Sequence, residues 1–199
     1  MARFYRYIHV SDDGHAPCVD HGLITLATCK PQIRSSAKAG DWVAGYMPKG
    51  LGEGLVTWVG RVAETVSPTD YERRFRGRKD AQCRLSDDGH VERVDPDYHP
   101  GIAEQRKDMS AKVLIFDPNA SWYFGDRPIE LPSMFGVLAA SGQGHRVNLR
   151  LPDDIAQIEA WLHGQVVAGV HGDPRDGAGC GTPCSTTPPR AKRRRSGGC

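Results

Sequence analysis

The run Leu55–Val66, LVTWVGRVAETV, constrains the fold of this chain more than any other segment. Its residues alternate between two faces at the period of a β-strand, with Trp58 and Val62 on one face and Val59 on the other. A glycine within a strand, here Gly60, is typical of a bulge or of a close approach to the backbone. The run therefore predicts a long strand, paired in a hairpin with the strand expected before it.

The rest of the chain alternates short strand-like runs with Gly- and Pro-rich turns. Short helices are expected after Pro31 and Pro68, and an amphipathic helix after Pro152, because proline is favoured in the first turn of a helix. Strands are expected at Phe4–Val10, Leu23–Thr28, Trp42–Tyr46, Leu55–Val66, Lys112–Asp117, Ser121–Phe124 and His145–Leu149. No long helices separate these strands, which disfavours a doubly wound fold. The pattern predicts an α+β domain built on a bent mixed sheet or a small β-barrel.

The charges divide the chain into two parts. Lys and Arg total 26, against 24 Asp and Glu in 199 residues. Residues 171–199 hold six basic and two acidic side chains, so residues 1–170 hold 20 and 22, a formal charge of −2. We expect one domain over 1–170, with a long excursion over 73–108, and a disordered basic tail over 171–199.

Several classes of protein are excluded by motifs that the sequence lacks. There is no secretory signal and no apolar run of about 18 residues, so we expect a cytoplasmic protein without a membrane partner. Six scattered cysteines are expected to be reduced thiols. The His and Asp side chains between His9 and His21 match no metal-ligand spacing, and no metal site is expected. No nucleophile elbow, Walker A or HExxH motif indicates hydrolase or NTPase chemistry, and no cofactor is indicated.

Two residues between an apolar strand and a helix are candidates for chemistry. Cys29 and Lys30 precede the helix that begins at Pro31, where a partial positive charge favours a thiolate or an anion. Arg34 lies one turn later and is placed to share an anion with Lys30. The alternative is a small buried cysteine beside solvated basic side chains.

A second candidate is the loop SGQGHR, in which Gly144 allows close approach to a ligand and His145 is suited to proton transfer beside Arg146. A surface histidine is the alternative. Among the aromatic residues, Trp42, Tyr123 and Phe124 are candidates for stacking on a base. Filling of the core is the alternative for these rings and is favoured for Trp58.

Four stretches in order, TLATCKPQIRSSAKAGDWVAGY, LVTWVGRVAETVSPTDYERRF, KVLIFDPNASWYFG and SGQGHRVN, resemble the nucleotide-modification-associated domains of the second type. The resemblance covers about residues 3–149. The arrangement is also distantly similar to PUA-like domains, which include modified-base readers of the EVE and YTH kind. This resemblance implies a pocket between the first strands and the hairpin. Its stacking walls would be Trp42, Tyr123 or Phe124, its polar lining would come from Cys29, Lys30, Arg34 and His145, and Asp12 would stand in its first loop.

Three functions follow as hypotheses. The first is a domain that binds a nucleotide or a modified base in DNA. It would act in a DNA-modification or phage-conflict pathway of bacteria, together with protein partners from that system. The second is an enzyme that modifies a nucleobase or nucleotide, with Cys29 as nucleophile and His145 as its acid/base partner. The third is a protein-interaction module whose basic tail alone contacts nucleic acid.

Overall fold

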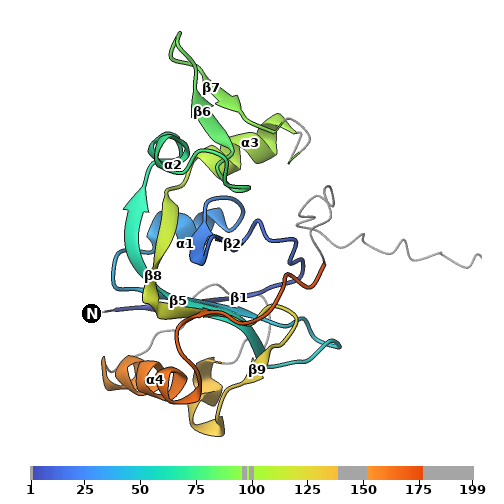
Figure 1. Ribbon diagram of the computed structural model, residues 1–199, viewed down its shortest axis with the longest axis vertical. Helices are drawn as coiled ribbons and strands as arrows, with labels where there is room; N and C mark the ends of the chain where they lie inside the picture. The colour runs from blue at the N-terminus through green and yellow to red at the C-terminus, as the bar shows by residue number, and fades with distance from the viewer. Residues whose placement is uncertain (1, 96–97, 99–100, 139–151, 177–199) are drawn as a thin grey trace, which may run out of the picture.

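The computed structural model describes residues 2–95, 98, 101–138 and 152–176 of the chain (Figure 1). The predicted strand at 145–149 and residues 177–199 of the expected tail lie outside them. The described residues form an α+β fold with a mixed, eight-stranded sheet and a separate two-stranded hairpin.

The sheet is open. Its order is β1-β4-β5-β8-β3-β2, with β10 beside β8 and β9 beside β5. β1 pairs with β4, and β10 with β8, in parallel, and the other pairings are antiparallel. The strands are β1 Phe4–Ile8, β2 Cys18–Asp20, β3 Leu23–Leu26, β4 Trp42–Tyr46, β5 Leu55–Val66, β8 Val113–Tyr123, β9 Ile129–Glu130 and β10 Gly169–Val170. The predicted mixed sheet is confirmed, whereas the barrel alternative is wrong, because these strands close no barrel.

The two longest strands, β5 and β8, change register where they pair. The shifts lie between Gly60 and Val62 and between Val62 and Glu64. A side chain at Gly60 would place its Cβ 2.6 Å from Ser121 Oγ, so only glycine fits here. The close approach expected at Gly60 is therefore confirmed. Irregular pairing of this kind bends a sheet and increases its twist.

Helices cover both faces of the sheet. The predicted C-terminal helix is present as α4, Pro152–Gln165, and its Ile158 and Leu162 pack with Trp122 and Val59. On the other face, α1 (Pro31–Ser36) contributes Ile33 to a second core cluster that includes Trp58, Tyr7 and Phe116. Figure 1 shows α4 and α1 on opposite sides of the sheet.

The excursion between β5 and β8 is a structured layer that stands away from the sheet (Figure 1). It comprises α2 Pro68–Arg74, the hairpin of β6 Cys83–Leu85 and β7 Val91–Arg93, and α3 Ile102–Met109. The remaining element, a 3-10 helix η1, spans Ser133–Leu138. The 73–108 segment thus carries regular structure that its sparse apolar residues did not predict.

A buried polar network ties this excursion to the sheet. Asp80 accepts hydrogen bonds from Thr25 Oγ1 at 2.6 Å and from Tyr71 Oη at 2.8 Å. Arg78 donates to the backbone carbonyls of Asp20 and Leu23 on the β2–β3 hairpin. Because a buried polar group is costly unless it is hydrogen-bonded, this network fixes where α2 and its following loop sit.

Residues 171–176, which we call the strap, return along the end of β8. The amide of His171 donates to Tyr123 O, and Asp126 and Asp173 exchange two hydrogen bonds. A second exchange joins Asp12 and Asp176. The Asp12 amide donates to Asp176 Oδ2, and the Asp176 amide donates to Asp12 O. The first residues of the expected tail are therefore part of the fold. No helix in the described part of the chain is long and apolar enough to cross a membrane.

Candidate functional site

A set of polar side chains meets at the end of β1, on the face of the sheet that α1 covers. We call it the β1-end cluster and define it as Tyr7, His9, Asp12, Lys30 and Tyr123. Tyr7 and His9 are two residues apart along β1 and its extension, so both point to this face. Asp12 comes from the following loop, Lys30 precedes α1, and Tyr123 ends β8.

The imidazole of His9 is 1% exposed. Its Nδ1 lies 2.8 Å from Thr57 Oγ1, and Gly45 O is within hydrogen-bond distance of the same hydroxyl. The Thr57 hydroxyl has one hydrogen, which either Nδ1 or Gly45 O accepts, so its choice decides which ring nitrogen of His9 carries the proton. Burial, assisted by the positive charges of Arg175 and Lys30, lowers the pKa of His9 to about 3, so the ring is neutral at physiological pH.

His9 Nε2 faces a carboxylate oxygen. Asp12 Oδ1 lies 3.6 Å away, and Nε2 has no hydrogen-bond partner among the described residues. The same Oδ1 accepts a hydrogen bond of 2.6 Å from Tyr123 Oη. Burial raises the pKa of Asp12, while the Tyr123 hydroxyl and Arg175 oppose that rise. The cluster thus contains a buried ring nitrogen that has no hydrogen-bond partner among the described residues.

Lys30 supplies the cationic side of the cluster. Its Nζ lies 4.7 Å from the centroid of the Tyr7 ring, a cation–π contact. Tyr7 is itself fixed, because its hydroxyl accepts from Trp58 Nε1 at 3.0 Å and donates to Ala16 O at 3.1 Å. The ammonium is thereby positioned while the side chain stays only partly buried.

The backbone at the β3–α1 junction is strained. Cys29 and Lys30 have φ values of 56° and 41°, in the left-handed region that side chains other than those of Gly, Asn and Asp seldom occupy. The amide of Cys29 donates to Asp108 Oδ1 at 2.9 Å, which helps to hold this geometry. Strain of this kind concentrates at functional sites.

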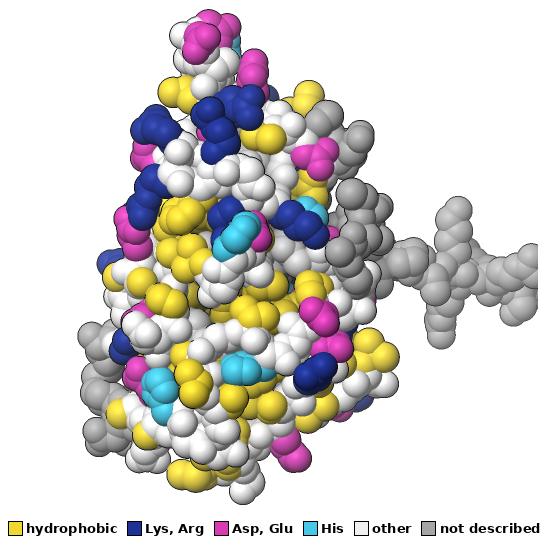
Figure 2. All heavy atoms as spheres, viewed as in Figure 1, with side chains coloured by type: hydrophobic (Ala, Val, Ile, Leu, Met, Phe, Trp, Pro, Cys, Tyr) yellow, Lys and Arg dark blue, Asp and Glu magenta, His cyan; other side chains and the backbone are white. Residues whose placement is uncertain are grey.

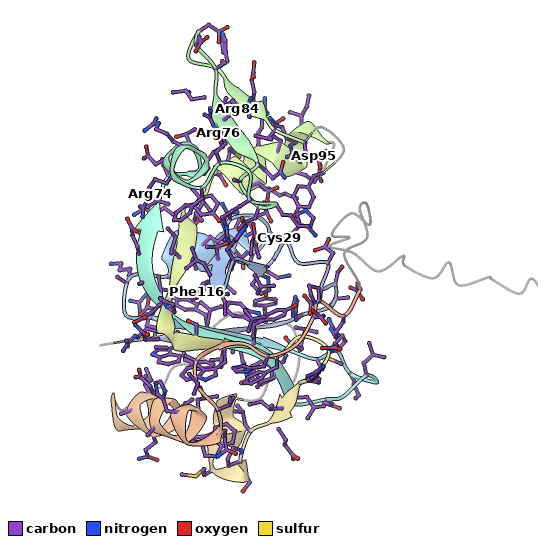
Figure 3. The ribbon with its side chains drawn as sticks, in the orientation of Figure 1. Cys29, Arg74, Arg76, Arg84, Asp95 and Phe116 are labelled. Atoms are coloured by element: carbon purple, nitrogen blue, oxygen red, sulfur yellow. The ribbon has the colours of Figure 1, made fainter. Side chains whose placement is uncertain are left out.

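Cys29 lies between the sheet and the excursion (Figure 3). Its side chain is buried, and its Sγ is 3.9 Å from Tyr98 Oη. The Tyr98 hydroxyl also bonds Thr28 Oγ1 at 2.9 Å, and the Tyr98 ring stacks on His15 with centroids 4.5 Å apart. The nucleophilic role of Cys29 stays a prediction, because its expected partner His145 lies outside the described residues, as do Gly144 and Arg146.

Arg34 is placed differently from its expected position beside an anion. Its side chain is fully buried, and it donates to the backbone carbonyls of Cys29, Asp108, Ala111 and Lys112. A phosphate contact would require some of these bonds to break. Arg34 therefore joins α1 to the end of the excursion.

The three candidate stacking rings occupy both faces of the sheet. Tyr123 lies in the core cluster on the α1 side, whereas Trp42 and Phe124 lie in the cluster on the α4 side. Trp42 packs parallel to Trp122 and Phe124 parallel to His171. The structure thus brings Asp12, Lys30 and Tyr123 together and leaves Trp42 and Phe124 elsewhere. Stacking by any of them on a base stays a prediction.

Sequence reasoning missed several residues at this site. Thr57 and Tyr7 were assigned only to strands, and Arg175 only to a tail, although the Arg175 guanidinium donates to His9 O at 2.6 Å. Strand alternation places Thr57 on the opposite face from Trp58, but β5 shifts register against β4 near this point. Such a shift leaves no signal in the sequence. Among the residues that the structure describes, no group of three or more His, Cys, Asp or Glu side chains is arranged to hold a metal.

Comparison with known proteins gives one match. Residues 1–82 match the family model of nucleotide modification associated domain 2. This stretch runs from β1 to the loop after α2 and contains Asp12, Cys29, Lys30, Arg34 and Trp42, but it excludes Tyr123, Phe124 and the 144–146 loop. No curated protein and no solved structure matches the chain.

The match is shorter than the resemblance over residues 3–149, and it covers the first two of the four resembling stretches. It associates the chain with nucleotide modification systems. Residues 1–82 of this chain are therefore similar to the nucleotide modification associated domain 2 family.

Proposed function

We propose that this chain binds a nucleotide or a modified base at the β1-end cluster, and that it serves a DNA-modification or phage-conflict pathway. The observation that carries the proposal is the neutral, buried His9 Nε2, which has no hydrogen-bond partner among the described residues, beside the cation Lys30. The edge of a nucleobase offers both hydrogen-bond donors and acceptors, and its phosphate offers an anion. One ligand of this class would satisfy both groups.

Lys30 is assigned to the phosphate, because its ammonium, held over the Tyr7 ring, is the cation of the cluster. His9 and Asp12 are assigned to the edge of the base, since His9 Nε2 and Asp12 Oδ1 lie 3.6 Å apart and are both polar. A base inside a duplex cannot reach buried groups, so the ligand is a free nucleotide, a single strand or a flipped base.

Binding of short single-stranded DNA tests this proposal. Fluorescence anisotropy would compare oligonucleotides that contain cytosine with matched ones that contain 5-hydroxymethylcytosine or another modified base. We expect a lower Kd for at least one modified form. Substituting Lys30→Ala should weaken binding about tenfold, as expected for loss of a charge-assisted contact. Lys38→Ala is the matched control, because Lys38 is an exposed lysine just past the end of α1.

Equal, weak binding of modified and unmodified oligonucleotides would contradict the proposal, as would equal effects of Lys30→Ala and Lys38→Ala. His9→Gln offers a second arm. Its amide replaces the imidazole, so selectivity between bases should fall while the Lys30-dependent affinity persists. Circular dichroism of each variant would confirm that the fold is intact.

A further inference from the structure

Arginines gather on the excursion, away from the β1-end cluster. Figure 2 shows dark blue side chains over α2 and β6, and Figure 3 shows Arg74, Arg76 and Arg84 in that same part of the molecule. With Arg73 they form a group of four exposed guanidinium groups. Their carboxylate partners divide them into two unlike pairs.

Arg73 and Arg74 use their terminal amino groups on exposed acids. Arg74 Nη1 and Nη2 donate to the two oxygens of Glu64 at 2.7 and 3.0 Å, a bidentate pair. Arg73 Nη1 donates to Asp70 Oδ1 at 2.9 Å. Each charge is matched by one carboxylate, so these two arginines have little to offer a further anion.

Arg76 and Arg84 share one carboxylate instead. Glu72 is 4% exposed, and its Oε1 lies 3.0 Å from Arg76 Nε and 3.6 Å from Arg84 Nε. Both guanidinium groups approach that oxygen by the Nε edge. Their side chains remain 68% and 47% exposed, and within the described residues their terminal amino groups make no hydrogen bond or ion pair.

The shared carboxylate has a geometric consequence. Two guanidinium groups share one buried carboxylate here, and Glu92 stands opposite Arg84 across the β6–β7 pair. Because both Nε atoms lie close to the same oxygen, the two guanidinium groups are near enough to each other to contact a single anion. A guanidinium fork that is already oriented loses less freedom when it binds. Planar forks with free terminal N–H groups match the oxygens of a phosphate.

We propose that Arg76 and Arg84, held together by Glu72, form a second contact for phosphate, and that the ligand is the backbone of a nucleic acid strand. The contact lies on the outer surface of the excursion and offers two guanidinium groups at one point. A single such contact suits a phosphate within a nucleic acid chain that the protein also contacts elsewhere. It carries no information about the base, because a phosphate contact is the same for every sequence. The proposal goes beyond base binding at the β1-end cluster and stands without it.

The salt dependence of oligonucleotide binding tests the proposal. A labelled single strand would be titrated into the full-length protein at several salt concentrations. For Arg84→Ala and Arg76→Ala, we expect affinity to fall by roughly threefold to tenfold at low salt, with the slope of log K against log salt reduced by about 0.7 to 1 per lost contact. Modified and unmodified strands should lose affinity equally. Arg74→Ala is the matched control, since its charge is already neutralised by Glu64.

A conservative variant separates geometry from charge. Arg84→Lys keeps the charge but removes the fork, so it should recover only part of the affinity. Competition with inorganic phosphate and with a mononucleotide distinguishes the source of the phosphate. Competition by the strand but by neither small anion at equal phosphate concentration supports the backbone assignment, and equal competition by the mononucleotide contradicts it.

An unchanged slope for both alanine variants, or a slope that Arg74→Ala changes as much, would overturn the inference. Its failure is distinguishable from failure of the proposed function. The Arg76 and Arg84 variants alter affinity for all strands alike, whereas the Lys30 and His9 variants alter the response to the base.

Discussion

Tyr123 Oη donates a 2.6 Å hydrogen bond to Asp12 Oδ1 and so joins residues 111 positions apart in the chain. Both side chains are buried, and no other side-chain hydroxyl donates to this oxygen among the described contacts. The bond connects the end of β8 to the loop after β1, and Asp12 extends the connection to the strap through Asp176.

Removing that hydroxyl should destabilise the protein. We expect Tyr123→Phe to lower the free energy of unfolding by about 1.5 to 3 kcal/mol, because it leaves a buried carboxyl group short of a donor. Urea denaturation followed by tryptophan fluorescence measures this. Tyr46→Phe is the matched control: the Tyr46 hydroxyl is buried without a hydrogen-bond partner among the described residues, so its loss should cost little. Equal effects of the two variants would contradict the role of the Asp12 bond.

Lowering the pH should reduce the free energy of unfolding, because His9 takes up a proton more readily in the unfolded chain than in the native fold. Because burial lowers its pKa to about 3, the native ring stays neutral while the unfolded ring takes up a proton below its ordinary pKa of 6.5. Stability that depends on His9 is therefore complete above pH 6.5. It falls by up to about 1.4 kcal/mol per pH unit as pH drops from 6.5 toward 3.

Asp12 acts in the opposite direction. Its raised pKa means that its native carboxyl group accepts a proton more readily than the unfolded one as pH falls. Comparison of unfolding free energies for the wild type and His9→Gln between pH 7.5 and 4.5 isolates the histidine contribution. The variant should show a shallower decline, and parallel curves would show that His9 does not govern acid sensitivity.

Replacing Arg34 should lower the stability of the fold. Arg34→Ala leaves the backbone carbonyls that it binds without their donors in a buried setting, and we expect a loss of about 3 to 5 kcal/mol in the free energy of unfolding. Arg106→Ala, which removes an exposed arginine from α3, should change that free energy by less than about 0.5 kcal/mol. A stable Arg34→Ala protein that has lost only affinity for phosphate would restore the anion role expected from the sequence.

The enzyme hypothesis has its own test at Cys29. If Cys29 is a nucleophile, Cys29→Ala abolishes any change that the protein makes to a nucleotide, as followed by mass spectrometry, while the fold stays intact. Cys83→Ala is the control, because burial raises the pKa of that thiol to about 11 and so disfavours a thiolate. Turnover that survives in the Cys29→Ala protein would end the nucleophile hypothesis.

Removal of residues 177–199 tests the contribution of the tail. This segment carries Arg190, Lys192, Arg193, Arg194 and Arg195 and no acidic side chain. Ending the chain after Asp176 keeps the strap, whereas a cut before Gly172 would remove its bonds to Asp12. We expect the protein that ends after Asp176 to lose salt-sensitive affinity for all nucleic acid strands. It should keep any preference for a modified base. Complete loss of binding would favour the interaction-module hypothesis.

Local patterns predicted the longer strands of this fold and missed the short ones, β2, β6, β7, β9 and β10. The expected bounds of Trp42–Tyr46 and Leu55–Val66 agree with those of β4 and β5, since both runs are apolar and end at clear turns. β8 was expected as two strands because Pro118 and Asn119 resemble a turn. In the structure, the strand continues past them, because the register shift opposite Gly60 gives these exposed residues room outside the regular pairing.

The candidate site was harder to predict, because its contacts join distant segments. The spacing of His9 and Asp12 suggested scattered loop residues, and only the fold brings Thr57 and Tyr123 to them. Arg34 was expected to share an anion with Lys30, since nothing in its own helix shows that the end of the excursion covers it. Lys30 could be found from the sequence because its signal, a strand followed by Pro31, is local.

The register shifts of β5 also determine which changes in length the chain tolerates. Trp58 and Val59 follow one another in β5, so their side chains point to opposite faces of the sheet and belong to different core clusters. Deleting one residue between Leu55 and Gly60 would exchange the partners of every side chain along that stretch. The turn between β6 and β7, at residues 86–90, has no such constraint. Natural variation in length, and the insertion of a label or an affinity tag, should therefore be accepted at that turn and rejected in β5.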